Sequence, residues 1–307
     1  MKTTNPDVVV SYIKTKNKLR KIVSYSSETS PLRLYHQRIN AFLEERFVPS
    51  IFSKGYVKGQ SIFNNAQAHM YNDYFIMLDI KDFFQNICHK QLIDKLFYEI
   101  NLLESRQISK KECRELLKSC SISARGIPLG FITSPILSNI YLKEFDGVFY
   151  GKLKKLGLNN IIYTRYADDL TISFQTDNTS KQPEIEKNIA AIAESILSRY
   201  GLHINKQKTR SYSMHISNHV RITGVNITKD STKRKLTVGR TVKNELYWNA
   251  IKCLECKDEK LIQQVKGMQS FILSVEKNGY EHCYSPVMIN KIQALGFNSL
   301  RSLIDSL

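Results

Sequence analysis

The stretch NIIYTRYADDLTISF, residues 160–174, decides the fold of this chain. Two runs rich in β-branched and aromatic residues, 160–165 and 170–174, flank Tyr166-Ala167-Asp168-Asp169, which predicts a hairpin with two adjacent carboxylates at its tip. Acidic residues are depleted from strands and neighbouring like charges repel, so this tip is unfavourable unless a cation lies beside it. Mg²⁺ is a hard cation that proteins bind through carboxylates and substrate phosphates.

A third carboxylate ends another strand-like run, well upstream of the hairpin. The apolar run YFIML, residues 74–78, is followed directly by Asp79. If this strand pairs with the hairpin, Asp79, Asp168 and Asp169 share one metal site.

The composition points to a polyanionic partner. Lys and Arg number 45 against 28 Asp and Glu, which gives a formal net charge of +17 and a sequence pI near 9.5. Nucleic acid is the leading partner for such a charge, and the alternative is a basic protein whose charge only prevents association. The length of 307 residues allows one elaborate domain or two to three subdomains.

The sequence also argues against several classes. No apolar run approaches the roughly 20 residues that span a bilayer, and the first residues lack the apolar core of a signal peptide, so we expect a cytoplasmic protein. Six cysteines are dispersed, which favours reduced thiols over a disulfide framework. Cys253 and Cys256 form a lone C-x-x-C without a second pair, which indicates one face of a helix rather than a zinc site.

Periodicity predicts a chain of mixed helices and strands. Helical patterns cover residues 32–47, 91–117, 134–145 and 183–200, alternation returns at 220–238, and a helical tail follows residue 242. Ser134 is expected as the N-cap of its helix, with Pro135 at the first helical position. The basic segment 14–21 precedes the first helix and is a candidate phosphate contact.

This order of elements resembles the palm of the reverse transcriptases, and four motifs match in order. Residues 74–84 resemble motif A, 126–139 motif B, 166–169 motif C and 201–209 motif D. The resemblance implies an α+β fold with right-hand polymerase architecture. It assigns fingers to residues 1–75 with part of 100–125, an antiparallel-sheet palm to 76–230, and an α-helical thumb to 231–307.

Within that family the chain resembles the retron group. Asn65-Ala-Gln-Ala-His69 matches the N-A-x-x-H element before motif A, and Ile222-Thr223-Gly224 matches the V-T-G element with one conservative departure. The resemblance implies RNA contacts for Asn65, His69, Ile222, Thr223 and Gly224. Taken alone, His69 is also consistent with a buried, hydrogen-bonded histidine.

The resemblance also implies the catalytic groups. Asp79 and Asp168 are expected to bridge two Mg²⁺ ions, with Mn²⁺ as an alternative, while Asp169 assists. Lys208 is the candidate that protonates the pyrophosphate. Its rival is Lys206, and the alternative for either is a solvated lysine at a helix end. Asp82 is expected to be a solvated turn acid rather than a ligand.

Further residues are expected to hold the nucleotide and the duplex. Phe84 stands where the family places a ring beneath the sugar, where it would exclude a 2′-OH; as the alternative, Phe83 and Phe84 are core aromatics. Pro128-Leu129-Gly130 replaces the family's P-Q-G, so Leu129 can only pack. Lys14 and Arg20 resemble the basic fingers residues that hold the triphosphate, with Asn17 and Lys18 in place of the usual glycine of that turn. The resemblance also implies that Lys266 contacts the template-primer duplex.

The helix around 266–273 resembles the thumb helix that grips the duplex, although a helical cap of the core is the alternative. Basic and aromatic residues interleave before it, at Arg240, Lys243, Tyr247 and Trp248. Such interleaving suits backbone and stacking contacts and equally an amphipathic helix.

The function implied by the resemblance is an RNA-directed DNA polymerase of retron type. Such an enzyme copies its own structured non-coding RNA from deoxynucleoside triphosphates, primes at an internal 2′-OH, and yields branched RNA-DNA. Retrons serve in anti-phage defence with a separately encoded effector protein. The alternatives are a group II intron or abortive-infection reverse transcriptase, the intron being disfavoured by the absence of a maturase extension, and a catalytically silent RNA-binding scaffold.

Overall fold

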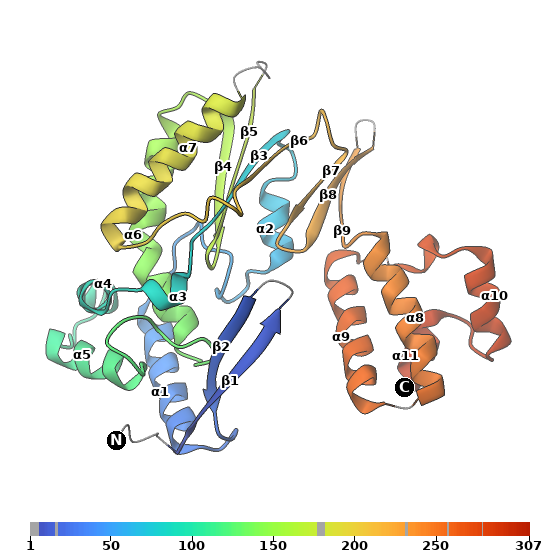
Figure 1. Ribbon diagram of the computed structural model, residues 1–307, viewed down its shortest axis with the longest axis horizontal. Coiled ribbons are helices and arrows are strands. Elements are labelled where there is room, and N and C mark those ends of the chain that lie inside the picture. The colour runs from blue at the N-terminus through green and yellow to red at the C-terminus, as the bar shows by residue number, and fades with distance from the viewer. Residues whose placement is uncertain (1–5, 16–17, 177–181, 231–232, 257, 278) are drawn as a thin grey trace. The chain divides into compact units, whose positions relative to one another are not determined.

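The computed structural model describes residues 6–15, 18–176, 182–230, 233–256, 258–277 and 279–307, without the side chains of residues 15 and 18–20. Helices alternate with antiparallel sheets, so the predicted α+β class is confirmed (Figure 1). Contacts divide the chain into two compact units. The first comprises the residues up to 60 and 72–211, and the second comprises 61–71 and 212–307.

A four-stranded sheet lies at the centre of the first unit, in the order β4-β5-β3-β6. Its strands are β3 (Tyr74–Asp79), β4 (Asn159–Tyr166), β5 (Asp169–Gln175) and β6 (Arg210–Ser213). β5 pairs antiparallel with β4 and with β3, the latter from Tyr74 opposite Phe174 to Asp79 opposite Asp169. The predicted hairpin and its pairing with the upstream strand are both confirmed.

Helices cover this sheet and a hairpin precedes them. These elements are β1 (Val8–Thr15), β2 (Lys18–Tyr25), α1 (Pro31–Arg46), α3 (Phe83–Asn86), α4 (His89–Asn101), α5 (Lys110–Ser119), α6 (Ser134–Lys154), α7 (Gln182–Leu197) and the 3₁₀ turn η2 (Ser198–Tyr200). In Figure 1, α6 and α7 lie together beside β4 and β5. One continuous core of buried side chains joins these helices to β3, β4 and β5.

Two helix boundaries differ from the sequence prediction. Thr133, not Ser134, is the N-cap of α6, because the Ser134 hydroxyl donates to the Pro128 carbonyl at 2.7 Å instead of capping the helix. The helix also runs past residue 145, since Phe149 and Leu153 continue its buried face. The pattern at 91–117 forms two helices, and Ser109 and Glu112 close a capping box at the start of α5.

The second unit combines a short helix, a three-stranded antiparallel sheet and a helical tail. Its elements are α2 (Ile62–Ala68), β7 (His219–Ile222), β8 (Val225–Asp230), β9 (Lys233–Thr237), α8 (Arg240–Cys256), α9 (Glu259–Val275), η3 (Glu281–Cys283), α10 (Pro286–Ala294) and α11 (Leu300–Ser306). Among the helices described, none combines the length and the apolar character that crossing a membrane requires. The division into two compact units does not test the assignment of fingers, palm and thumb, which stays a prediction.

A buried ion pair joins the central sheet to α6. Arg165 in β4 and Asp146 in α6 are both fully buried, and the guanidinium binds the carboxylate through two bonds of 2.8 Å. The Tyr163 hydroxyl donates to the same carboxylate at 2.8 Å, and burial raises the pKa of Tyr163 well above its ordinary value. A buried charge is tolerated only when it is paired and hydrogen-bonded, as both are here.

We expect Arg165→Met to lower the free energy of unfolding by about 3–5 kcal/mol, because it leaves the Asp146 carboxylate buried without a counter-charge. The double variant Arg165→Met/Asp146→Asn should recover part of this loss, since it carries no buried charge and still offers Tyr163 an acceptor. Urea unfolding of the three proteins measures both effects. A single variant as stable as the unaltered chain would contradict the assigned pairing.

Candidate active site

The two adjacent carboxylates lie in a tight turn, here called the carboxylate turn, residues 166–169. Tyr166 pairs with Asp169, so only Ala167 and Asp168 form the loop between β4 and β5. Ala167 has a φ of 56°, the left-handed conformation that two-residue hairpin loops need to match the strand twist. The loop therefore presents both carboxylates at one end of the hairpin.

Asp79 joins this end of the sheet from β3. It lies opposite Asp169 in the register of β3 and β5, and the next amide, of Ile80, donates to the Asp168 carbonyl at 3.0 Å. Asp79 is 8% exposed, whereas Asp168 and Asp169 reach solvent. The structure thus places Asp79, Asp168 and Asp169 at the same end of the sheet.

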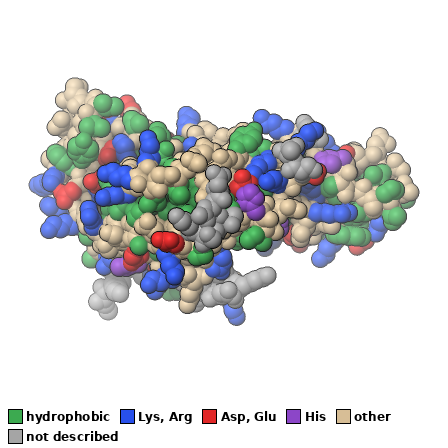
Figure 2. All heavy atoms as spheres, turned by 90° about the horizontal axis from the view of Figure 1, so that it is seen from above, with side chains coloured by type: hydrophobic (Ala, Val, Ile, Leu, Met, Phe, Trp, Pro, Cys, Tyr) green, Lys and Arg blue, Asp and Glu red, His purple; other side chains and the backbone are tan. Residues whose placement is uncertain are grey.

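The environment of the three carboxylates changes the protonation of Asp169. Partial burial of its carboxyl, and then the charges of Asp168 and Asp79, together raise the pKa of Asp169 to about 6, against a smaller opposing effect of Lys208. The pKa of Tyr56 is raised as well, by burial and then by the charge of Asp168. A net negative charge therefore collects at the carboxylate turn, although Lys and Arg side chains are spread widely over the surface seen in Figure 2.

Lys208 is the cation that the structure places at this site. Its ammonium lies 2.8 Å from Asp79 Oδ2, and its side chain remains half exposed. The backbone brings it there, because the Asn205 amide donates to the Asp79 carbonyl at 2.7 Å and Lys208 closes the turn that follows. Lys206 is exposed and lies in the same loop. Of the two predicted candidates, Lys208 is the one bonded to an active-site carboxylate.

The residues of the site suit a hard divalent cation. Oxygen ligands and unbalanced negative charge are what Mg²⁺ and Mn²⁺ require. Within the described part of the chain, however, no three His, Cys, Asp or Glu side chains stand ready in a metal-binding arrangement. Lys208 occupies one oxygen of Asp79, and three carboxylates without a cation repel one another. The metal site at Asp79, Asp168 and Asp169 stays a prediction.

The loop at 126–130 is fixed by two glycines with positive φ. A Cβ on Gly130 (φ 106°) would lie 2.4 Å from the Val23 carbonyl oxygen, and one on Gly126 (φ 78°) 2.7 Å from that of Gln85. The Val23 amide donates to the Leu129 carbonyl at 2.8 Å, which ties the loop to β2. Only glycine permits such close backbone approach. The loop Pro128-Leu129-Gly130 is therefore held in one conformation beside the β1–β2 hairpin.

The other residues predicted to contact the nucleotide lie in the core, on the surface, or outside the described residues. Leu129 packs against the core, as its side chain leads us to expect, and Phe84 is 7% exposed, with its ring edge-on to Phe83 at 5.2 Å. Lys14 is exposed on β1. Asn17 and the side chains of Lys18 and Arg20 lie outside the described residues. Asp82 has a φ of 46° before α3 and provides no side-chain cap.

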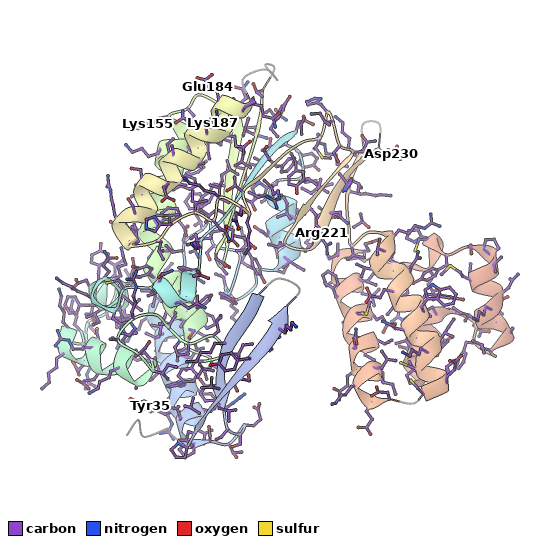
Figure 3. All side chains as sticks on the ribbon, viewed as in Figure 1. Tyr35, Lys155, Glu184, Lys187, Arg221 and Asp230 are labelled. Carbon is purple, nitrogen blue, oxygen red and sulfur yellow. The ribbon has the colours of Figure 1, made fainter. Side chains whose placement is uncertain are left out.

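The two elements that resemble retron motifs bind each other in the second unit. Thr223 and Gly224 form the two-residue loop between β7 and β8, with φ of 44° and 94°. A β-branched residue in this conformation is strained, and the buried Asn65 amide donates to the Thr223 hydroxyl at 3.2 Å. Asn65, His69 and Ile222 are buried, so in this conformation they offer RNA no surface. Thr223 and Gly224 reach solvent, and so does the neighbouring Arg221 (Figure 3).

Two of the basic and aromatic residues predicted to interleave on the helical tail are buried in the structure. Lys243 is buried against Glu276 at 2.5 Å, and the buried Tyr247 donates to the Met288 carbonyl at 2.9 Å. Neither presents its head group for a backbone or stacking contact. Trp248 is 54% exposed, with the Lys291 ammonium 5.2 Å from its ring, and Arg240 and Lys266 are also exposed.

Sequence reasoning missed the residues that support the carboxylate turn, although signals for most of them exist in β4 and α6. Tyr163 and Arg165 are two apart in β4 and therefore share the face that binds Asp146. Asn139 and Asp146 are seven apart, two turns of α6, on a face that is otherwise apolar. A charged residue inside each apolar pattern indicates a buried pair. Gly55 carries no such signal, since it lies in a loop of ordinary appearance.

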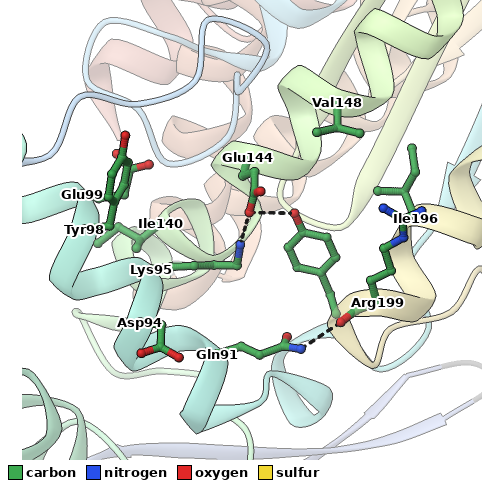
Figure 4. Close-up of a pocket in the computed structure, with 11 residues that line it drawn as sticks. Gln91, Asp94, Lys95, Tyr98, Glu99, Ile140, Glu144, Val148, Ile196 and Arg199 are labelled. Carbon is green, nitrogen blue, oxygen red and sulfur yellow. Dashed lines mark hydrogen bonds and ion pairs between the residues drawn. The ribbon is translucent and has the colours of Figure 1, made fainter. Parts of the chain in front are cut away.

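Two cavities flank different parts of the first unit. One of about 640 Å³ adjoins the carboxylate turn and is lined by Tyr166, Tyr56, Ile132, Pro135 and Ile136 among others. Another, of about 660 Å³, lies between α4, α6 and the end of α7, and Lys95 binds Glu144 inside it at 2.5 Å (Figure 4). Because none of the three carboxylates lines this second cavity, we assign it no part in the site.

Comparisons with known proteins agree with this geometry. The family model described as reverse transcriptase (RNA-dependent DNA polymerase) matches residues 14–229. The Ec86 retron reverse transcriptase of Escherichia coli is 30% identical over 77% of this chain and 66% of that protein. The Ec73 enzyme of the same organism is 35% identical over 41% of each chain, and the Mx162 enzyme of Myxococcus xanthus is 26% identical over 71% of this chain and 48% of that protein. The chain therefore spans less than two thirds of each of these relatives.

A solved structure shares the fold. Telomerase from Candida albicans, in complex with a TWJ fragment of telomeric RNA, matches 98% of this chain and 61% of that chain with a TM-score of 0.51 and 14% identity. At this identity the likeness concerns the fold alone, and it supports the right-hand polymerase architecture.

The raised pKa of Asp169 predicts that Asp169→Asn increases the free energy of unfolding at high pH. A carboxyl whose folded pKa of about 6 exceeds its unfolded value of 3.8 destabilises the folded chain increasingly as pH rises between these values. In the presence of a chelator, the variant should be more stable than the unaltered chain at pH 8 by about 1 kcal/mol, after allowance for solvent screening. The gain should vanish near pH 4. Chemical denaturation at both values tests this, and equal stability at pH 8 would refute the repulsion.

Proposed function

The chain belongs to the reverse transcriptase (RNA-dependent DNA polymerase) family, and from this premise we propose that it is the RNA-directed DNA polymerase of a retron. One observation carries the proposal: Asp79 ends β3 opposite Asp169 of β5, Asp168 lies in the adjoining turn, and the pKa of Asp169 is raised to about 6. A polymerase needs such an anionic cluster to hold divalent cations against a triphosphate. An RNA-binding scaffold has no need of it.

The residues of the site act by binding and positioning. Asp79 and Asp168 would hold the cations, and Asp169 would add negative charge beside them. Bound Mg²⁺ or Mn²⁺ would lower the pKa of the primer hydroxyl and neutralise charge on the leaving pyrophosphate. A cation at Asp79 would compete with Lys208 for that carboxylate. The ammonium of Lys208 would then be free to donate a proton to the pyrophosphate.

Nucleotide and duplex are assigned to different parts of the chain. Phe84 excludes a ribonucleotide by its bulk, and Pro128-Leu129-Gly130 contacts the incoming nucleotide with its backbone. The β1–β2 hairpin, with Lys14 and Arg20, belongs to the fingers and contacts the triphosphate. The tail from residue 231 is the thumb, where Lys266 contacts the template-primer duplex. The family's division into fingers, palm and thumb supports these assignments.

The template is the protein's own structured non-coding RNA, primed at an internal 2′-OH, with branched RNA-DNA as the product. Similarity to several retron reverse transcriptases supports this substrate. The exposed Thr223-Gly224 loop, with Arg221 beside it, is the surface that recognises this RNA. Such an enzyme acts in the cytoplasm, where deoxynucleoside triphosphates are available. It acts with a separately encoded effector in anti-phage defence.

We expect Asp168→Asn to lower primer extension with Mg²⁺ and deoxynucleotides by at least about 10²–10³-fold, because it removes one cation ligand while the side chain keeps its shape. RNA binding should stay within twofold. Asp94→Asn is the matched control, since that carboxylate is exposed and pairs with the exposed Lys110 at 2.7 Å. Full activity of Asp168→Asn, or no extension by the unaltered chain, would reject the polymerase and favour the scaffold.

Leu129 stands where the family has glutamine, so we expect Leu129→Gln to add a contact to the nucleotide. The backbone bond from Val23 persists in this variant, so the loop should keep its conformation. A glutamine amide can then reach the nucleotide, which should lower the KM for deoxynucleotides about 3- to 10-fold, the effect of one hydrogen bond. Steady-state kinetics and product sequencing measure KM and error rate. If neither changes, position 129 has no role in nucleotide selection.

A further inference from the structure

Gly55 touches the backbone of the carboxylate turn from behind. A Cβ added to Gly55 would lie 2.7 Å from the Ala167 amide nitrogen and 3.2 Å from the Tyr166 Cα. The φ of Gly55 is not positive, so its own backbone would accept a side chain. The requirement for glycine at position 55 therefore comes from the turn that it touches and not from local conformation.

The segment around Gly55 is bonded to β4 one residue before the turn. The Arg165 amide donates to the Phe52 carbonyl at 2.8 Å, and the Lys54 amide donates to the Arg165 carbonyl at 2.7 Å. These bonds form a parallel bridge between Ser53 and Arg165. Since β5 pairs with the other edge of β4, the strand that enters the turn is held on both sides.

Buried side chains close this arrangement into a ring of hydrogen bonds. Arg165 Nη1 donates to the Ala167 carbonyl at 3.3 Å and to Asn139 Oδ1 at 3.0 Å. The Asn139 amide donates in turn to the Gly55 carbonyl at 3.0 Å, and the Ser53 hydroxyl donates to Asn139 Oδ1 at 3.0 Å. The ring links the left-handed residue of the turn, the loop that carries Gly55, and α6. Its side chains are fully or almost fully buried.

We propose that Ser53, Gly55, Asn139 and Arg165 form a brace that fixes the position of the carboxylate turn. In this brace, Gly55 determines how closely the turn approaches the segment at 52–55. None of the four is a catalytic residue, because their contacts end on the backbone of the turn. They are positioning residues. The proposal rests on the proposed function, since the value of a fixed turn lies in holding Asp168 and Asp169 opposite Asp79.

The brace explains why a fully buried charge pair is retained beneath the turn. The Asp146 carboxylate takes two donors of the Arg165 guanidinium, which leaves Nη1 directed at Ala167 and Asn139. Phosphoryl transfer depends on placement within fractions of an ångström, and a displacement of about 1 Å can lower the rate about 10²-fold. A methyl group at position 55 meets backbone and not a flexible side chain, so the turn or the segment that carries Gly55 must move by a few tenths of an ångström.

Gly55→Ala tests the brace, with Gly147→Ala as the matched control. Gly147 lies in α6, and a Cβ there meets nothing within 4 Å. Gly55→Ala should lower kcat for primer extension about 30- to 100-fold, with template-primer affinity within twofold and the melting temperature within about 4 °C of the unaltered chain. Gly147→Ala should leave kcat unchanged. A Gly55→Ala protein that folds and keeps kcat within twofold overturns the proposal.

A second variant, and a measurement that does not depend on activity, test the brace independently of the proposed function. Ser53→Ala removes one hydroxyl of the ring without adding bulk, and it should lower kcat about 5-fold, the loss of one hydrogen bond. If Gly55→Ala does not fold, an unchanged kcat in Ser53→Ala overturns the brace. With ¹⁵N-alanine labelling, the Ala167 amide resonance should move in Ser53→Ala and Gly55→Ala but not in Gly147→Ala. An unmoved resonance overturns the brace even if the unaltered chain extends no primer, an outcome that rejects only the polymerase.

Discussion

The close placement of three carboxylates, Asp79, Asp168 and Asp169, which are partly withdrawn from solvent and repel one another, is the constraint on which the rest of this structure depends. Asp79 in β3 lies opposite Asp169 in β5, and Asp168 lies in the turn that joins β4 to β5. Without a cation, the pKa of Asp169 is raised to about 6, and the Lys208 ammonium, which is bonded to Asp79, opposes this only in part. Such a cluster persists only if the surrounding backbone cannot relax away from it.

Rigid backbone around the turn supplies that resistance. β3 and β4 hold β5 from both sides, and the segment at 52–55 bridges the free edge of β4. Beneath the turn, the pair of Arg165 and Asp146 is shielded from solvent and anchored to α6. Because this pair is buried, replacing either residue alone would leave an unpaired charge in the core and destabilise the backbone that holds the turn. The loop at 126–130 is fixed in the same way, by glycines that touch neighbouring backbone.

Local sequence pattern predicted the strands and the carboxylates of the site. The alternation of residues 160–174 and the apolar run 74–78 define β4, β5 and β3 because strand periodicity is a local signal. Position 134 was misassigned as an N-cap because the Ser134 hydroxyl donates to Pro128, six residues away, and a tertiary contact leaves no local pattern. Asn65 and His69 were expected to face RNA, yet they are buried, since the motif they belong to packs against the β7–β8 loop. Gly55 could not be found either, because its role depends on a chain segment more than a hundred residues away.

The most direct test of the account is a calorimetric titration of Mn²⁺ into the full chain at pH 6 and pH 8, in two buffers of different ionisation enthalpy. At pH 6 about half of the molecules carry a proton on Asp169, so cation binding should release it and the measured heat should differ between the buffers. At pH 8 the two heats should agree. Saturable binding that is lost in Asp79→Asn would complete the prediction. No saturable binding, or identical heats in both buffers at pH 6, would contradict a cation site built on repelling carboxylates.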